Sequence, residues 1–310
     1  MNLNKPAFWD SKQVSLWAIL LLPITALYCL ILAARRVIKN PKKFNIKTIC
    51  IGNIYLGGTG KTPLTIKMAS LLESKFNLVI VKKEYTDQKD EIAMLKQSCK
   101  VITHKSRISA IEQAVKENYN LAIMDDGFQD EEIKKDISIL CFSSAQSVGN
   151  GFIIPSGPLR ESLDRIKCSD IVFINGDLNP DLEKKIKSYK QDIKIFYSAY
   201  HLLNANYFKD KNYFVFSGIG NNINFLNLLK KNKINISEYK FFPDHYEYSD
   251  HDINKLKNHA LKNKLHLLTT EKDYLRLSEK NKENIEHSKI ELIINDEEKL
   301  VKQIVSYENS

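Results

Sequence analysis

A glycine-rich turn between an apolar run and an amphipathic run limits most strongly how this chain can fold. Residues 52–63 read Gly-Asn-Ile-Tyr-Leu-Gly-Gly-Thr-Gly-Lys-Thr-Pro, after an apolar run at 46–51 and before an amphipathic stretch at 63–75. A buried strand, a glycine-rich turn and a helix in this order are the context of a phosphate-binding loop. We predict such a loop; the alternative is a chance turn, since Tyr55 stands where the strict G-x-x-x-x-G-K-[ST] pattern has glycine.

The predicted loop supplies the groups that bind a nucleotide. Backbone N–H groups of the turn and the positive end of the helix dipole attract phosphates. Lys61 would reach the β- and γ-phosphates of ATP, and Thr62 would hold Mg²⁺. We expect nucleotide contacts at Tyr55, Leu56, Gly57, Gly58, Thr59, Gly60, Lys61 and Thr62.

Composition narrows the class of protein. The chain has 310 residues, and 46 basic against 37 acidic side chains give it a net charge of +9. An anionic membrane, an anionic substrate or compositional bias explains this excess better than nucleic acid, because aromatic residues do not interleave with the basic ones. The five cysteines lie far apart, so neither a disulfide framework nor a zinc site is indicated, which fits a reducing cytosol.

An uncharged apolar segment near the N-terminus predicts a membrane helix. Val14 to Ala34 would span about 31 Å as a helix, close to the thickness of a bilayer core. The positive-inside rule places the rest of the chain in the cytoplasm, at the inner membrane. A cleaved signal peptide would normally show the opposite charge asymmetry, whereas an interfacial or buried helix stays open. The cationic residues that follow are Arg35, Arg36, Lys39, Lys42, Lys43 and Lys47.

Beyond residue 45, apolar strands alternate with polar-faced helices, which predicts a parallel α/β sheet followed by a second, smaller α/β domain. We expect an anchor and basic flank at 1–44, a nucleotide-binding domain at 45–205 and the smaller domain at 206–310. The expected strands are 46–51, 78–81, 100–103, 121–124, 137–142, 171–174, 193–197, 213–216, 236–242, 265–269 and 290–294. The expected helices are 63–75, 91–97, 106–117, 181–189, 222–231 and 250–263, with a further helix opening at Thr270.

Two acids end one of these strands. Asp125 and Asp126 follow the apolar run Leu121–Met124, and carboxylates at a strand end beside a phosphate loop are typical ligands of the nucleotide's Mg²⁺. An ordinary Asp-Asp-Gly turn is the alternative. We predict Asp125 and Asp126, together with Thr62, as the metal-binding residues.

Two later loops carry further candidates. In the Gly- and Pro-rich loop 149–161, Arg160 suits a phosphate, although a surface salt bridge with Glu161 is an equal alternative. The turn 242–246 presents Asp244 and His245 together, which is a modest catalytic signal. Thr270 reads as a helix N-cap with acids in the first turn, which favours a structural role.

Taken together and in order, these motifs resemble tetraacyldisaccharide 4′-kinase, the lipid A 4′-kinase family of Gram-negative bacteria. The resemblance covers almost the whole chain, and the family also lacks glycine at the position of Tyr55. The matching pieces are the apolar helix, Gly52-Asn53, Gly57–Pro63, Asp125–Gln129, Gly149–Gly151, Pro155, Gly157–Glu161, Ser217–Asn221, Phe242–His245 and Thr270–Asp273.

The resemblance implies a membrane-bound kinase. It would transfer the γ-phosphate of ATP, with Mg²⁺, to the 4′-hydroxyl of a tetraacylated disaccharide 1-phosphate, giving lipid IVA. Lys61 and the loop would hold phosphates, Arg160 would neutralise charge, and Asp90, assisted by His245, would accept the hydroxyl proton. The rival interpretation is a membrane-anchored P-loop NTPase that acts on a protein partner.

The chain departs from the family pattern after its second strand. The family usually has Ser-Arg-Gly-Tyr-Gly there, whereas this chain reads Lys82-Lys83-Glu84-Tyr85-Thr86. The family's Gly-Asp-Glu-Pro, whose Asp is thought to be the base, corresponds best to Lys89-Asp90-Glu91-Ile92. Asp87 remains the alternative base.

Overall fold

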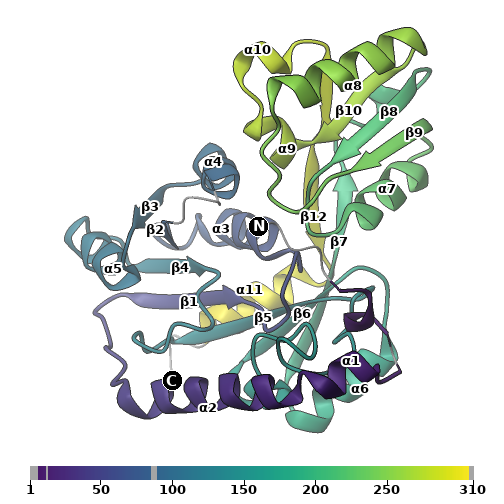
Figure 1. The fold of residues 1–310 in the computed structure, drawn as a ribbon. Coiled ribbons are helices and arrows are strands. Elements are labelled where there is room, and N and C mark those ends of the chain that lie inside the picture. Colours follow the sequence, from purple (N-terminus) through teal and green to yellow (C-terminus); the bar gives the residue numbers. More distant parts are fainter. Residues whose placement is uncertain (1–5, 12, 85–88, 307–310) are drawn as a thin grey trace. The chain divides into compact units, whose positions relative to one another are not determined.

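The computed structural model describes residues 6–11, 13–84 and 89–306 (Figure 1). These residues form two compact units. The larger unit lies within 3–84, 98–199 and 294–310, and the smaller unit includes 85–97 and 200–293. The chain passes between the units in strands β7 and β12.

A mostly parallel sheet forms the centre of the larger unit. Its strand order is β12-β7-β6-β5-β1-β4-β2-β3, and the pairs from β7 to β3 are parallel. Buried runs on the central strands favour this arrangement, because a parallel sheet is covered on both faces. The strands are β1 Lys47–Gly52, β2 Leu78–Lys83, β3 Val101–His104, β4 Leu121–Asp125, β5 Ile137–Ser143, β6 Ile171–Asn175, β7 Lys194–Leu202 and β12 Ile290–Ile294.

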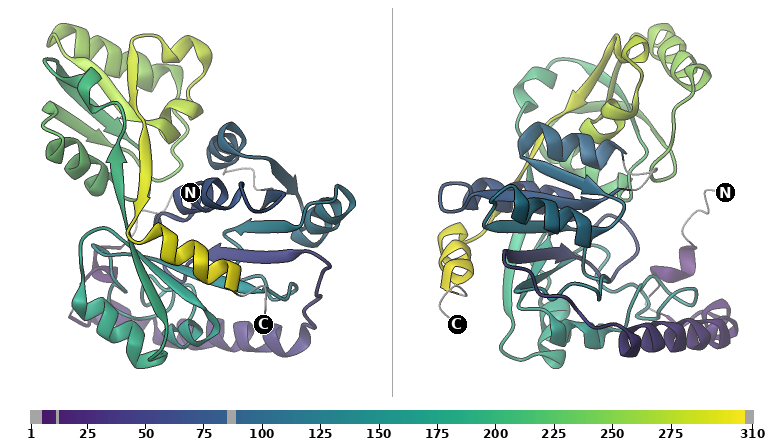
Figure 2. Two further views of the ribbon diagram at one scale, coloured as in Figure 1. Left: turned by 180° about the vertical axis from the view of Figure 1, so that it is seen from behind. Right: turned by 90° about the vertical axis from the view of Figure 1, so that its left-hand side faces the viewer.

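Helices with local capping signals accompany this sheet. Asn179 caps α6 by accepting from the Leu182 backbone N–H, and Pro180 occupies its first turn. Figure 2 shows α11 in yellow near the C-terminus; the Lys47 ammonium donates to its Ile304 carbonyl. The helices are α3 Lys61–Leu72, α5 Arg107–Lys116, α6 Pro180–Tyr189 and α11 Glu297–Ser306, with short 3₁₀ helices at Ala7–Trp9 and Leu163–Cys168.

The smaller unit has its own parallel sheet, in the order β11-β10-β8-β9. Alternate residues of β8 enter different cores: Tyr213 packs with Leu229 of α7, and Phe214 packs with Leu256 of α8. The elements are β8 Asn212–Ser217, β9 Asn235–Phe241, β10 His266–Thr270, β11 Ile285–Ser288, α4 Lys89–Ser98, α7 Asn222–Lys231, α8 Asp250–Lys262, α9 Glu271–Arg276 and α10 Glu279–Lys282, with a 3₁₀ helix at Ala205–Phe208.

The apolar N-terminal segment forms two helices, α1 Leu16–Leu20 and α2 Leu22–Ile38, rather than the single helix expected over Val14–Ala34. Pro23 lies in the first turn of α2. Because proline has no backbone N–H, it cannot continue the hydrogen bonding of α1 and instead starts a new helix. Among the residues that the structure describes, no helix is both long enough and apolar enough to cross a membrane.

The expected α/β class and parallel sheet are confirmed, and the units can be compared with the expected domains. The smaller unit begins at Tyr200, near the expected boundary at 205–206, but it also takes in 85–97. The segment from Ile294 onward groups with the larger unit. Sequence analysis did not predict β11, α10 or α11.

Candidate functional site

The glycine-rich loop joins β1 to α3, as its sequence predicts. Gly57 has a φ of 135°, and Gly60, the N-cap of α3, has a φ of 91°. Side chains disfavour both conformations, so glycine is needed at these two positions. The loop therefore ends at a helix N-terminus, where backbone N–H groups and the helix dipole favour an anion.

The buried side chain of Asn53 holds the glycine-rich loop in place through hydrogen bonds. Its side chain is fully buried, and its amide nitrogen donates to the Tyr55 carbonyl (2.7 Å), the Gly57 carbonyl (3.2 Å) and the Thr59 hydroxyl (2.9 Å). Gln129 in turn donates to the Asn53 carbonyl. Sequence analysis included Asn53 in the motif but assigned it no role. The signal that could have identified it is an amide side chain at the end of a strand, directly before a glycine-rich loop.

Tyr55 and Leu56 lie differently from the rest of the predicted nucleotide contacts. The Tyr55 ring is fully buried and its hydroxyl donates to Asp10 at 3.0 Å; burial and this carboxylate raise the pKa of Tyr55. The Leu56 backbone N–H donates to the Pro158 carbonyl at 2.8 Å. These contacts connect Tyr55 and Leu56 to the surrounding fold, and their role as nucleotide contacts stays a prediction.

Asp125, the last residue of β4, lies against the first turns of α3. Its carboxylate accepts from the Thr62 hydroxyl at 3.3 Å, the Thr65 hydroxyl at 3.0 Å and the Lys82 ammonium at 2.6 Å. The Asp125 side chain is fully buried. Thr62 and Asp125 are thus brought together as predicted, whereas Lys82 was not predicted as a partner.

Asp126 is the more accessible carboxylate, with 13% of its side chain exposed. Its oxygen Oδ1 lies 3.7 Å from the Lys61 ammonium and 3.3 Å from a guanidinium nitrogen of Arg160. Burial raises the pKa of Asp126, but Lys61, Arg160, Lys82 and Arg107 outweigh it and leave that pKa below its usual range. Three predicted residues, Lys61, Asp126 and Arg160, are therefore neighbours.

Arg160 does not form the expected alternative salt bridge with Glu161. Glu161 is buried and pairs instead with Arg165 at 2.8 Å and with Arg36 of α2 at 2.5 Å. Consecutive residues of this loop thus point to different partners, which frees the Arg160 guanidinium for Asp126. The phosphate role of Arg160 remains a prediction.

Arg107, at the start of α5, forms hydrogen bonds with the backbone of the two acids. This buried guanidinium donates to the carbonyls of Asp125 (3.2 Å) and Asp126 (2.6 Å). Asp126 has a φ of 53°, a conformation that few non-glycine residues adopt. The two hydrogen bonds hold this turn, and no local sequence signal identified Arg107.

The donor set fits magnesium bound together with a nucleotide better than a metal held by protein alone. Within the part of the chain that the structure describes, no three His, Cys, Asp or Glu side chains gather to hold a metal ion. Mg²⁺ usually takes one or two carboxylates and completes its shell with phosphate oxygens and water. Asp126 and the Thr62 hydroxyl are suitable ligands of that kind.

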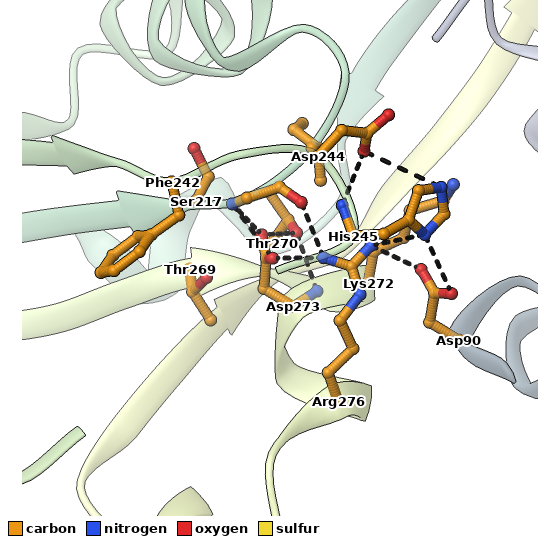
Figure 3. Close-up of polar contacts among 12 residues, drawn as sticks. Asp90, Ser217, Phe242, Asp244, His245, Thr269, Thr270, Lys272, Asp273 and Arg276 are labelled. Atoms are coloured by element: carbon orange, nitrogen blue, oxygen red, sulfur yellow. Dashed lines mark hydrogen bonds and ion pairs between the residues drawn. The ribbon is translucent and has the colours of Figure 1, made fainter. Parts of the chain in front are cut away.

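A second polar cluster lies in the smaller unit (Figure 3). Asp90 of α4 places its oxygen Oδ1 3.6 Å from His245 Nδ1. Burial raises the pKa of Asp90, but His245, Arg276 and Lys272 outweigh it and lower the value to about 2. The interaction of the imidazole with the Asp90 carboxylate is the main cause that raises the pKa of His245. The predicted Asp90–His245 pair is therefore present, while Asp87 lies outside the described residues.

Arg276 of α9 links this pair to the interior of the smaller unit. One guanidinium nitrogen donates to Asp90 Oδ2 at 2.7 Å, and the other donates to Asp273 (2.9 Å) and to the Gly218 carbonyl (2.7 Å). Asp273 is buried, and burial raises its pKa despite Arg276. Its predicted structural role is confirmed, because its backbone N–H donates to the N-cap residue Thr270.

Two further contacts complete the cluster. Lys272 donates to Glu91, the residue after Asp90, at 2.7 Å. Asp244 accepts from the His245 backbone N–H and lies 3.9 Å from His245 Nε2. The imidazole thus has a buried carboxylate on one side and an exposed one on the other (Figure 3).

Comparisons with known proteins extend over the whole chain. A family model described as tetraacyldisaccharide-1-P 4′-kinase matches residues 17–308. A tetraacyldisaccharide 4′-kinase of Pelagibacter ubique is 42% identical over 312 residues, which cover 98% of each chain. One of Rickettsia akari is 34% identical over 323 residues, covering 98% of this chain and 97% of the relative.

A solved structure shares the fold. LpxK from Aquifex aeolicus, described as an apo form in complex with ATP, matches with a TM-score of 0.73 and 24% identity. The match covers 94% of this chain and 99% of the other.

Proposed function

The chain belongs to the tetraacyldisaccharide-1-P 4′-kinase family, and from this premise we propose how its residues carry out the reaction. It is an enzyme of the kinase class that acts in lipid A biosynthesis. It transfers the γ-phosphate of ATP to the 4′-hydroxyl of tetraacyldisaccharide 1-phosphate and so forms lipid IVA. The arrangement of Lys61, Asp126 and Arg160 beside the glycine-rich loop is the observation that supports this role most directly.

The glycine-rich loop and Lys61 hold the phosphate chain of ATP. Backbone N–H groups of residues 57–62 and the N-terminus of α3 attract the β- and γ-phosphates, and Lys61 adds a mobile positive charge. Arg160 neutralises charge on the transferred group. Such groups act by positioning and electrostatics, which supply most of the catalysis in phosphoryl transfer.

Thr62 and Asp126 hold Mg²⁺ in this proposal. The Thr62 hydroxyl donates its proton to Asp125, so its lone pairs stay free for a cation. Asp126 is the carboxylate that is partly exposed. The bound ion would supply charge neutralisation at the β- and γ-phosphates.

His245 and Asp90 together take the proton of the sugar hydroxyl. A carboxylate with a pKa of about 2 is a weak base at neutral pH, whereas an imidazole is well matched to it. We therefore assign the proton transfer to His245 and an orienting role to Asp90, which also stabilises the charged imidazole. This division refines the sequence-based expectation, in which Asp90 was the base.

The two faces of α2 differ in the way expected of a helix that lies in the membrane interface. One face is bound to the larger unit: Thr25 donates to Ser156 at 2.8 Å and Tyr28 to the Arg160 carbonyl at 3.3 Å. The other face exposes apolar residues at helical spacing. These residues are Ile24, Leu27 and Ile31, and Leu16, Trp17 and Leu20 of α1 are exposed as well.

We infer that this face lies in the cytoplasmic leaflet of the inner membrane. A lipid with four acyl chains stays in the bilayer, so its kinase must work at the bilayer surface. The exposed Arg35 in the last turn of α2 suits anionic headgroups. The rival function, an NTPase with a protein partner, is not favoured by the full-length similarity to kinases.

One assay tests the function. Purified protein is incubated with ATP, Mg²⁺ and tetraacyldisaccharide 1-phosphate in mixed micelles, and the lipid is scored for a second phosphate. We expect transfer by the wild type and loss of it in Lys61→Ala. ATP turnover that ignores the lipid but rises with a protein fraction would favour the rival.

A further inference from the structure

Lys82 is a buried cation beside one of the two acids of the nucleotide site. Its side chain is 1% exposed, and its ammonium lies 2.6 Å from Asp125 Oδ2. The two residues are register partners in the parallel pairing of β2 with β4, so the backbone itself places them side by side.

This ion pair fixes the role of Asp125. Oxygen Oδ2 accepts from Lys82 and Thr62, and Oδ1 accepts from Thr65, so donors occupy both oxygens. Separating these two buried charges would remove a 2.6 Å ionic contact from each of them, which is unfavourable. Asp125 is therefore held as an acceptor for the Thr62 hydroxyl, and a cation bound at Asp125 would have to share the carboxylate with the Lys82 ammonium.

Lys82 also changes the electrostatics of the site. Lys61 and Arg160 lie 3.7 Å and 3.3 Å from the neighbouring acid Asp126. Arg107 donates to the backbone carbonyls of both acids with one guanidinium nitrogen, and another nitrogen lies 3.5 Å from Asp130. Three carboxylates, those of Asp125, Asp126 and Asp130, thus face four positive side chains. Such a site attracts the polyanionic phosphate chain but repels a divalent cation.

We propose that Lys82 withdraws Asp125 from metal coordination, so that this kinase binds ATP tightly without a divalent metal and binds that metal weakly. The inference rests on the proposed nucleotide site. It predicts two effects of opposite sign when the lysine charge is removed: metal-free ATP binds more weakly, and the metal binds more tightly. A purely structural role for Lys82 would weaken both.

The test compares Lys82→Ser with the matched control Lys83→Ser, which removes a positive charge from the next residue of β2. The ATP dissociation constant is measured by calorimetry in EDTA, and Mn²⁺ affinity by electron paramagnetic resonance on ADP-saturated protein. For Lys82→Ser we expect ATP to bind about tenfold more weakly and Mn²⁺ about tenfold more tightly, as the loss of one nearby charge predicts. Lys83→Ser should change each constant by less than about twofold.

A double variant guards against misfolding of the single one. Lys82→Met with Asp125→Asn removes both buried charges, and replacing a whole ion pair is often tolerated. We expect its Mn²⁺ dissociation constant to stay within about threefold of wild type. A loss of about 100-fold would show that Asp125 is itself a metal ligand and would overturn the inference.

The remaining outcomes are also decisive. Lys82→Ser values equal to wild type, equal shifts in Lys83→Ser, or weaker binding of both ligands would each overturn the inference while leaving the kinase assignment intact. If the wild type bound neither ATP in EDTA nor Mn²⁺ with ADP, and phosphorylated no lipid, the proposed function itself would fail.

Discussion

The substitution Asp90→Asn should lower the pKa of His245. The interaction with the Asp90 carboxylate is the largest influence that raises this pKa, and asparagine keeps the shape of the side chain without its charge. The imidazole should therefore lose its proton at a lower pH in the variant. This result would show that the two groups act as a coupled pair.

The distance between the two groups sets the size of the shift. Asp90 Oδ1 and His245 Nδ1 are 3.6 Å apart, which gives about 1.2 kcal/mol at the dielectric constant of water and about 4.6 kcal/mol at a value of 20. The His245 side chain is 26% exposed, which favours the lower figure, and Arg276 lies 3.5 Å from the same nitrogen and opposes the effect. We expect a fall of about one pKa unit, since 1.36 kcal/mol corresponds to one unit.

The assay is an NMR titration of the imidazole signals, with His245 identified by its absence in His245→Gln. Asp244→Asn is the matched control, because Asp244 is 41% exposed and 3.9 Å from the ring; its effect should be clearly smaller. The acid limb of kcat/KM should move by the same amount in Asp90→Asn, because this limb reports the free enzyme. A His245 pKa that stays within about 0.3 unit of wild type would refute the coupling.

Three further results are expected. Lys61→Ala should lower kcat at least about 10²-fold with an unchanged melting temperature, and near-normal turnover would exclude the loop as the phosphate site. Leu27→Glu with Ile31→Glu should reduce flotation with anionic liposomes and raise KM for the bilayer-borne lipid but not for ATP; unchanged partitioning would argue against α2 as the membrane face. Because the Asp90 pKa is lowered from 3.8 to about 2, its stabilisation is complete above pH 3.8 and disappears as pH falls through 2. The difference in urea midpoint between wild type and Asp90→Asn should therefore shrink between pH 5 and pH 2, whereas a constant difference would mean that Asp90 stabilises without its charge.

Local sequence signals were sufficient for the phosphate loop and most of the sheet. The glycines at 57 and 60 adopt backbone conformations that other residues avoid, so their positions mark the turn directly. The central strands β1, β4, β5 and β6 are largely apolar because both faces of the sheet are covered there, and this makes them visible as continuous runs. Thr270 was likewise readable as an N-cap, since the residue type and the acid three positions later act locally.

Other features depend on contacts between segments that lie far apart in the sequence. Arg276 reaches Asp90 across 186 positions, and Arg107 supports the turn at Asp125 and Asp126 from another helix. The sequence around each arginine does not differ from that of an ordinary exposed helix. The position of α11 is of the same kind, because its grouping with the larger unit follows from the path of β12.

The two adjacent acids show why a motif alone does not assign chemistry. Sequence analysis gave Asp125 and Asp126 the same metal-binding role, yet successive residues at the end of a strand point to opposite sides. Asp125 turns inward to Thr62 and Lys82, while Asp126 leaves the strand with a positive φ and turns toward Lys61. Burial then gives the two acids different roles. A fully buried carboxylate needs hydrogen-bond donors that stay in place, whereas a partly exposed carboxylate can exchange its partners. In the proposed site, the register of β2 against β4 would select the acid that binds the cation, because it places Lys82 beside Asp125 and leaves Asp126 for the ligand.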